Sequence, residues 1–300
     1  MINTILTAIT GDPTRRILLR RSQIEWSRET SDEKDSGYRT VTATIRAASG
    51  LEFDMTLRWP EHTADAQRGT EPDRHGARPL VLILGGQKSG RAAAALIRDT
   101  KGAIVAALSY PYHVAPWPTG PAILFGLHKI HAALLDTPAA IMLALDYIHR
   151  RGDLKSSSVD LVGVSLGVPF VCVAAALDSR FSRVWSIHGA GEPFKLLEHN
   201  LRVRFDWAPV RKVMTAIAHV VASGRALAPE RWVARISPRP FVMINAVDDA
   251  RIPRSAALTL FQSAREPKEL HWMEGGHVAV DREDVIVRLC EMIFRRVSRR

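Results

Sequence analysis

The chain has 300 residues, 46% of them hydrophobic, and a formal net charge of +10 at pH 7. This is long enough for one large domain with a buried core, and the composition excludes a disordered or fibrous chain. No apolar run reaches the roughly 20 residues that cross a bilayer. The N-terminus places apolar residues before basic ones, the reverse of a secretory signal, so we expect a cytoplasmic protein without a membrane span.

The positive charge comes mostly from arginine, in pairs such as Arg15-Arg16 and Arg295-Arg296 near the two ends of the chain. Such a charge could attract anionic partners. However, the chain lacks a zinc finger, an RNA-binding sheet motif and a basic helix with interleaved aromatics, so we expect a solvated surface and no nucleic-acid partner. The two cysteines, Cys172 and Cys290, cannot build a disulfide framework and are expected to be packing residues.

Residues 1–40 are predicted to be a partly flexible N-terminal segment, because residues 27–37 are polar and typical of an exposed loop. Residues 41–47 and 52–59 alternate apolar and polar positions on either side of Ser49-Gly50, which predicts an antiparallel hairpin. Residues 60–79 are rich in proline, glycine and charge and predict a long surface loop. We therefore expect the main domain to span residues 41–300.

From residue 79 onward, continuous apolar runs alternate with helical patterns. Strands are predicted at 80–84, 103–108, 159–164, 184–188, 240–246 and 269–273, and helices at 91–100, 122–135, 139–151, 166–177, 254–265 and 281–296. Unbroken apolar strands between helices indicate an α/β fold with a mostly parallel, doubly wound sheet. Residues 109–121 and a small helical insertion at about 190–236 leave from carboxyl ends of strands, where such sheets bind ligands, so we expect them to wall a pocket or form a lid.

The most informative motif is Gly163-Val164-Ser165-Leu166-Gly167, which follows an apolar strand and precedes an almost wholly apolar helix. A serine on a tight strand-to-helix turn projects its hydroxyl out of the sheet, and the flanking glycines remove side chains that would collide with the returning helix. Such a serine becomes a nucleophile when a base takes its proton, a carboxylate orients that base and N–H groups hold the oxyanion.

Candidates for both partners follow later strands. Asp249 lies between a strand and a helix, and His277 follows the last strand behind two glycines that allow a tight turn. Asp248 and Glu192 are less favoured choices for the acid, and either Asp248 or Asp249 could cap the helix that follows.

The remaining site predictions concern the oxyanion, the substrate and metals. The predicted oxyanion donors are the amide of Leu166 together with that of Gly86 or Gln87. The candidate substrate contacts are Tyr110, Tyr112, His113, Trp117, His188 and Phe194. For each of them, ordinary packing explains the residue as well as a role in substrate binding does. The 11 histidines show no metal-ligand spacing, so no metal is expected.

With nucleophile, acid and histidine in this order, about residues 40–297 resemble the α/β-hydrolase fold, most closely dienelactone-hydrolase-like esterases and the catalytic domain of prolyl-oligopeptidase-type enzymes. The resemblance is carried by the hairpin with residues 79–86, the helix segment 144–148 and residues 249–253. In such hydrolases the acid commonly precedes a proline by four residues and follows a small residue by three, relations that Asp249 has with Pro253 and Ala246. The chain departs from the pattern before Gly85, where many relatives have histidine, and at Val168, where glycine is frequent.

The resemblance implies a serine hydrolase that cleaves carboxylic esters of small molecules through an acyl-enzyme, without a cofactor. The same chemistry would serve a peptidase, a thioesterase or an acyltransferase, because pocket shape and water access choose among them. A hydrolase-like binding protein without catalysis and a nucleic-acid-binding protein with a basic surface are the alternatives from other classes.

Overall fold

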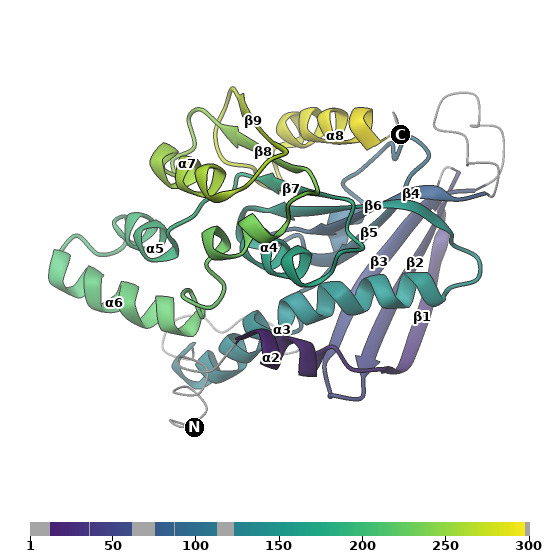
Figure 1. Ribbon diagram of the computed structural model, residues 1–300, viewed down its shortest axis with the longest axis horizontal. Coiled ribbons are helices and arrows are strands. Elements are labelled where there is room, and N and C mark those ends of the chain that lie inside the picture. Colours follow the sequence, from purple (N-terminus) through teal and green to yellow (C-terminus); the bar gives the residue numbers. More distant parts are fainter. Residues whose placement is uncertain (1–12, 36, 62–75, 87, 113–122, 298–300) are drawn as a thin grey trace.

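The computed structural model describes residues 13–35, 37–61, 76–86, 88–112 and 123–297 (Figure 1). Within these residues, nine strands form one sheet in the order β1-β2-β3-β5-β4-β6-β7-β8-β9. The strands are β1 (Ile24–Asp35), β2 (Tyr38–Ala47), β3 (Glu52–Pro60), β4 (Arg78–Leu84), β5 (Ile104–Leu108), β6 (Ser156–Val164), β7 (Arg183–Ile187), β8 (Phe241–Ala246) and β9 (Lys268–Met273). The strands from β4 to β9 pair in parallel, whereas β1, β2 and β3 add an antiparallel part that joins through β5. The predicted fold class is confirmed.

Helices cover both faces of the sheet (Figure 1). The face that we call the packed face lies against α2 (Pro13–Arg20), α3 (Ile123–Arg150), α4 (Val168–Leu177) and α7 (Arg254–Ser263). The opposite face, here the α8 face, lies against the short 3₁₀ helix η2 (Gly90–Ala94) and α8 (Glu283–Val297). Because side chains alternate along a strand, Leu80, Leu82 and Leu84 of β4 point into one core, whereas Val81 and Ile83 point into the other.

Between β7 and β8 the chain forms the helical insertion that the sequence predicts. It contains α5 (Pro193–Leu201), α6 (Ala208–Val221) and the 3₁₀ turns η5 (Pro229–Arg231) and η6 (Val233–Arg235). No helix in the described part of the chain is both long enough and apolar enough to cross a membrane.

Three local predictions were wrong. Residues 27–35 are part of β1 and not of a loop, because β2 supplies the hydrogen-bonding partner that overrides their polar composition. The helix expected at 91–100 shortens to η2. The two helices expected around Pro138 are one, α3, in which the Thr137 hydroxyl donates a 2.7 Å hydrogen bond to the Ala133 carbonyl one turn earlier.

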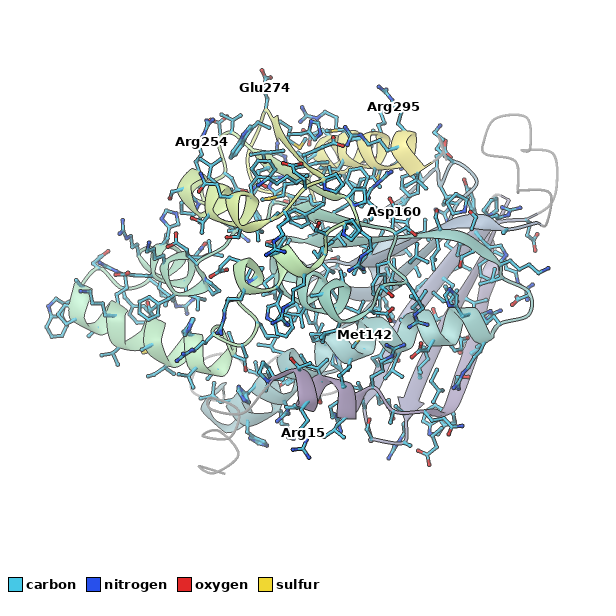
Figure 2. All side chains as sticks on the ribbon, in the orientation of Figure 1. Arg15, Met142, Asp160, Arg254, Glu274 and Arg295 are labelled. Carbon is cyan, nitrogen blue, oxygen red and sulfur yellow. The ribbon has the colours of Figure 1, made fainter. Side chains whose placement is uncertain are left out.

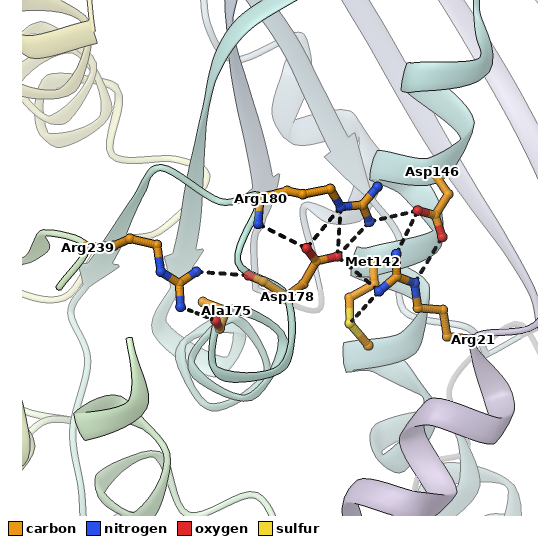
Figure 3. A network of polar contacts seen from close by, with 7 residues as sticks. All are labelled: Arg21, Met142, Asp146, Ala175, Asp178, Arg180 and Arg239. Carbon is orange, nitrogen blue, oxygen red and sulfur yellow. Dashed lines mark hydrogen bonds and ion pairs between the residues drawn. The ribbon is translucent and has the colours of Figure 1, made fainter. Parts of the chain in front are cut away.

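Much of the arginine charge is paired within the fold. Figure 3 shows Arg21, just after α2, in an ion pair with Asp146 of α3 (2.8 Å), and Arg180 in one with Asp178 at the end of α4 (2.6 Å). Burial alone would raise the pKa of each of these two carboxyls, but the arginine hydrogen bonds and charges lower it. Arg239, ahead of β8, donates hydrogen bonds to the backbone oxygens of Ala175 (2.7 Å) and Asp178 (2.9 Å). These arginines therefore connect α2, α3, α4 and the approach to β8.

Other charged side chains point away from the core, as Figure 2 shows for Arg15, Arg254, Glu274 and Arg295. Asp160 is an exception because it is buried, where it accepts a 2.8 Å hydrogen bond from the Trp185 indole. Both cysteines are free thiols: Cys172 is buried in α4, and Cys290 is partly buried in α8.

Candidate active site

Ser165 stands on a sharp turn directly after β6, where one turn of 3₁₀ helix, η4 (Ser165–Gly167), leads into α4. Its φ of 52° is in the left-handed region, which a non-glycine residue occupies only when its surroundings enforce it. At Gly163 a Cβ would lie 2.4 Å from a Val171 methyl of α4, and at Gly167 it would lie 2.2 Å from the Leu84 carbonyl oxygen of β4. The two glycines thus let α4 return against β6 and let the turn approach β4.

Two hydrogen bonds of 2.8 Å connect Ser165 to His277 and His277 to Asp249. The first joins Ser165 Oγ to Nε2 of His277, and the second joins Nδ1 of His277 to Oδ2 of Asp249. In a neutral imidazole, Nδ1 donates a hydrogen bond to a carboxylate only when Nδ1 carries the proton, which leaves Nε2 as the acceptor for the serine hydroxyl. The side chains predicted to be the nucleophile, the base and the orienting acid are therefore connected by hydrogen bonds.

The loops after β8 and β9 hold these residues together. The Val247 amide donates to the Met273 carbonyl (2.9 Å), and the Asp248 amide donates to that of Gly275 (3.2 Å). Gly275 has a φ of 106°, a conformation that side chains disfavour, so glycine is required to turn the chain toward His277.

Asp249 is almost completely buried, with 1% of its side chain exposed. Its second oxygen, Oδ1, accepts hydrogen bonds from the backbone amides of Arg251 (2.9 Å) and Ile252 (3.0 Å). Burial alone would raise the pKa of Asp249, but hydrogen bonds from His188 and His277, the charge on His277 and the Arg251 amide together lower it strongly. Asp249 is therefore held as a carboxylate.

His188 also donates to Asp249. This residue follows β7, is fully buried and has a φ of 50°, and its Nδ1 lies 2.8 Å from the same Oδ2 that accepts from His277. The two imidazoles meet edge to face, with 5.2 Å between ring centroids. Nε2 of His188 is buried and has no hydrogen-bond partner among the described residues. Of the described residues, His188, Asp249 and His277 form a cluster of metal-ligand type, but both Nδ1 atoms are used in hydrogen bonds to the carboxylate.

The other candidate acids lie elsewhere. Asp248 is exposed, beside Asp249 on the same turn. Glu192 pairs with Lys195 and accepts a 3.3 Å hydrogen bond from the Thr259 hydroxyl. The relation to Pro253 and Ala246 therefore selects the aspartate that contacts His277.

A cavity of about 640 Å³ opens beside Ser165, on the α8 face. Ser165, His277, Leu166 and Gly86 all line it, so the backbone segments expected to supply oxyanion donors border the same space as the serine hydroxyl. Gln87, the alternative donor, lies outside the described residues.

The candidate substrate contacts lie away from this cavity. His188 is buried under Asp249, and the Tyr110 hydroxyl donates a 2.9 Å hydrogen bond to the Gly85 carbonyl from within the core of the packed face. Tyr112 also packs against that core, and Phe194 packs edge to face on His219 in the insertion. None of these four lines the cavity, and His113 and Trp117 lie outside the described residues.

The cavity walls come instead from β4, β6, η2 and α8, which sequence reasoning assigned to packing alone. The alternation of Val81 and Ile83 with the leucines of β4 marks the two faces of the strand. This alternation does not indicate how closely a helix packs on either face of the sheet.

A scan against protein-family models and a search of curated proteins found no match. The structure is similar to solved structures over most of its length. An acetyl xylan esterase from Paenibacillus sp. R4 matches with a TM-score of 0.66 at 16% sequence identity. The match covers 95% of this chain and 93% of the esterase chain. Acetyl xylan esterase 1 from Thermoanaerobacterium sp. JW/SL YS485 has a TM-score of 0.61 at 13% identity, with coverages of 94% and 92%.

A third neighbour is the α/β hydrolase GrgF from Penicillium sp. sh18, with a TM-score of 0.56 at 16% identity over 87% of this chain and 99% of that one. At such identities the likeness concerns the fold. The protein therefore has the α/β-hydrolase fold, as the sequence resemblance implies.

Proposed function

We propose that the protein is a serine esterase that hydrolyses carboxylic esters of small molecules. The observation that supports this most is the unbroken pair of 2.8 Å hydrogen bonds from Asp249 through His277 to a serine in a left-handed turn. The esterases among its structural neighbours agree with this proposal.

In the first step, Ser165 Oγ attacks the ester carbonyl while Nε2 of His277 accepts its proton. Asp249 holds the imidazole in the Nδ1–H tautomer and stabilises the positive charge that develops on it. The backbone amide of Leu166 and that of Gly86 or Gln87 donate to the oxyanion, an interaction that typically contributes about 10²–10³ in rate per donor. His277 then returns the proton to the departing alcohol.

In the second step, water replaces the alcohol, and His277 removes a proton from it as the water attacks the acyl-enzyme. Collapse of the second tetrahedral intermediate breaks the bond to Ser165, whose Oγ takes the proton back from His277, and releases the carboxylic acid. Each step is a proton transfer and an acyl transfer that these side chains perform without a cofactor.

Hydrolysis of p-nitrophenyl esters by the wild type and by Ser165→Ala tests this function. We expect the substitution to lower kcat roughly 10⁶-fold with the fold intact by circular dichroism. Ser263→Ala is the matched control, since its hydroxyl donates to the Thr259 carbonyl in α7, away from the site, and should leave the rate unchanged. A Ser165→Ala enzyme as active as the wild type would contradict the proposal.

A further inference from the structure

The cavity beside Ser165 continues into the layer between the sheet and α8. Its sheet wall includes Val81 and Ile83 of β4 and Val162 of β6, and its helix wall includes Leu289 and Ile293. All five of these side chains are apolar. At about 640 Å³ the cavity falls within the roughly 300–1,000 Å³ of small-molecule sites.

The volume of the cavity exceeds what an acetyl group needs. Val81 precedes the end of β4 at Leu84 by three residues, which corresponds to about 10 Å along a strand. The residues that line the cavity therefore reach about that far below the sheet edge on which Ser165 stands, and Val81 itself is fully buried. An acetyl group on Ser165 would occupy only the mouth of the cavity.

The sequence of η2 explains why this layer is open. The packed face has the 28-residue helix α3, whereas on the α8 face the turn η2 beside α8 has only five residues, Gly-Arg-Ala-Ala-Ala. Ala93 lines the cavity with a single methyl group, and Gly85 adjoins it without a side chain. Small side chains on a short turn cannot fill the space that a full helix would occupy.

Polar and charged side chains are found at the mouth. Ser165 and His277 lie there with Lys88, Arg251 and Asp281, and the last three are exposed. The rim also has apolar side chains that face solvent, since Leu96, Leu166 and Val280 are 39%, 42% and 47% exposed. This arrangement suits a molecule with a long apolar chain and a polar end.

We propose that the cavity binds the acyl chain of the substrate, so that the preferred substrates are esters of medium- and long-chain fatty acids. The inference rests on the esterase function proposed above and specifies its substrate class. The acyl part is favoured over the alcohol because it stays bonded to Ser165 after the alcohol has left. A chain seated along β4 and α8 then holds the acyl-enzyme in place while water enters at the polar mouth.

The test is a series of p-nitrophenyl esters from acetate through butyrate and octanoate to dodecanoate, which share one leaving group. Burying each methylene should raise kcat/KM by up to about fourfold until the chain fills the cavity. Esters of acetic acid with alcohols of increasing length form the second arm. If kcat/KM rises with the alcohol and not with the acyl chain, or is highest for acetyl esters, the acyl assignment is wrong.

Substitutions on α8 test whether the acyl chain binds in this cavity. Cys290 lines the cavity from α8, so Cys290→Phe should lower the ratio of octanoate to acetate kcat/KM at least tenfold, whereas Cys290→Ala keeps the space and should retain the wild-type ratio. Val287→Phe is the matched control, because Val287 is 43% exposed on α8 and is not part of the cavity lining. An unchanged ratio in folded Cys290→Phe would overturn the proposal.

Binding distinguishes failure of this inference from failure of the esterase function. Calorimetric titration of dodecanoate into Ser165→Ala needs no catalysis and should show binding with a negative heat-capacity change. The double variant with Cys290→Phe should lose this binding. If no ester is hydrolysed but dodecanoate binds in this way, the cavity proposal stands and the esterase proposal fails. If esters are hydrolysed but dodecanoate does not bind, the cavity proposal fails alone.

Discussion

The two faces of the sheet are built from the same strands but are covered in different ways. On the packed face, Leu80 and Leu82 of β4 are fully buried under long helices, whereas on the α8 face the neighbouring Val81 and Ile83, although also buried, line a cavity of about 640 Å³. Apolar side chains form both faces, so composition does not separate them. What differs is the set of elements laid over them, which includes the 28-residue helix α3 on one side and consists of the five-residue turn η2 with the 15-residue helix α8 on the other.

This difference assigns separate tasks to the two faces. The packed face supplies close contact and hence stability, because interior packing leaves few voids. The α8 face gives up some of that contact to leave room beside Ser165. Substitutions at the site or on the α8 face should therefore change activity, and those on the packed face should change stability.

The largest effect is expected at the carboxyl edge of the sheet. Asp249→Asn should lower kcat by about 10⁴, because an amide in place of the carboxylate favours the wrong tautomer of His277. Steady-state kinetics with a p-nitrophenyl ester measure the loss, and circular dichroism checks the fold. Asp248→Asn is the matched control and should retain activity, since Asp248 is exposed. Greater loss in Asp248→Asn than in Asp249→Asn would show that the acid is misassigned.

A pair of adjacent residues on β4 compares the two faces directly. Leu82→Ala should destabilise the protein by about 2–5 kcal/mol and leave the ratio of octanoate to acetate kcat/KM unchanged. Ile83→Ala should have a smaller effect on stability, because the atoms removed already border open space, but it should change that ratio. Urea unfolding and ester kinetics measure both. If both variants lose the same unfolding free energy and keep the wild-type ratio of octanoate to acetate kcat/KM, the two faces do not differ in function.

His188 is expected to act as a positioning residue through Asp249. His188→Ala should lower kcat about tenfold, and the acidic limb of the pH profile should move to higher pH because Asp249 loses a hydrogen bond that lowers its pKa. His188→Asn should recover most of the rate, since asparagine tolerates the left-handed backbone and retains an N–H donor. A role confined to packing would predict a loss of stability with an unmoved pH profile.

The smallest effect concerns acid stability. Because the folded pKa of Asp249 is lowered, its ionised form stabilises the folded protein at pH values above the unfolded pKa of about 3.9. This contribution is lost as the pH falls through the folded pKa. The gap in unfolding free energy between the wild type and Asp249→Asn should therefore narrow below about pH 4. A gap that stays constant from neutral to acid pH would contradict the lowered pKa.

The fold was largely predictable because burial on both sides leaves unbroken apolar strands such as β4 and β6. The prediction failed for β1, where hydrogen bonding to β2 outweighs the polar composition of the segment. It also failed at Pro138, where the buried residues before and after the proline form one continuous helix, α3. Ser165, Asp249 and His277 could be placed together from their positions after parallel strands. The contact of His188 with Asp249 could not, because it depends on side-chain orientation at a left-handed residue. Nor could the cavity, which depends on how η2 and α8 pack on β4.

The most direct test of the account is to label the folded protein with a fluorophosphonate and to map the modified residue by peptide mass spectrometry. We predict a single adduct on Ser165 in the wild type, which is lost in His277→Ala under the same conditions because the serine then lacks its base. Labelling at another residue, or a folded wild-type protein that does not react, would contradict the claim that Ser165 is an activated nucleophile.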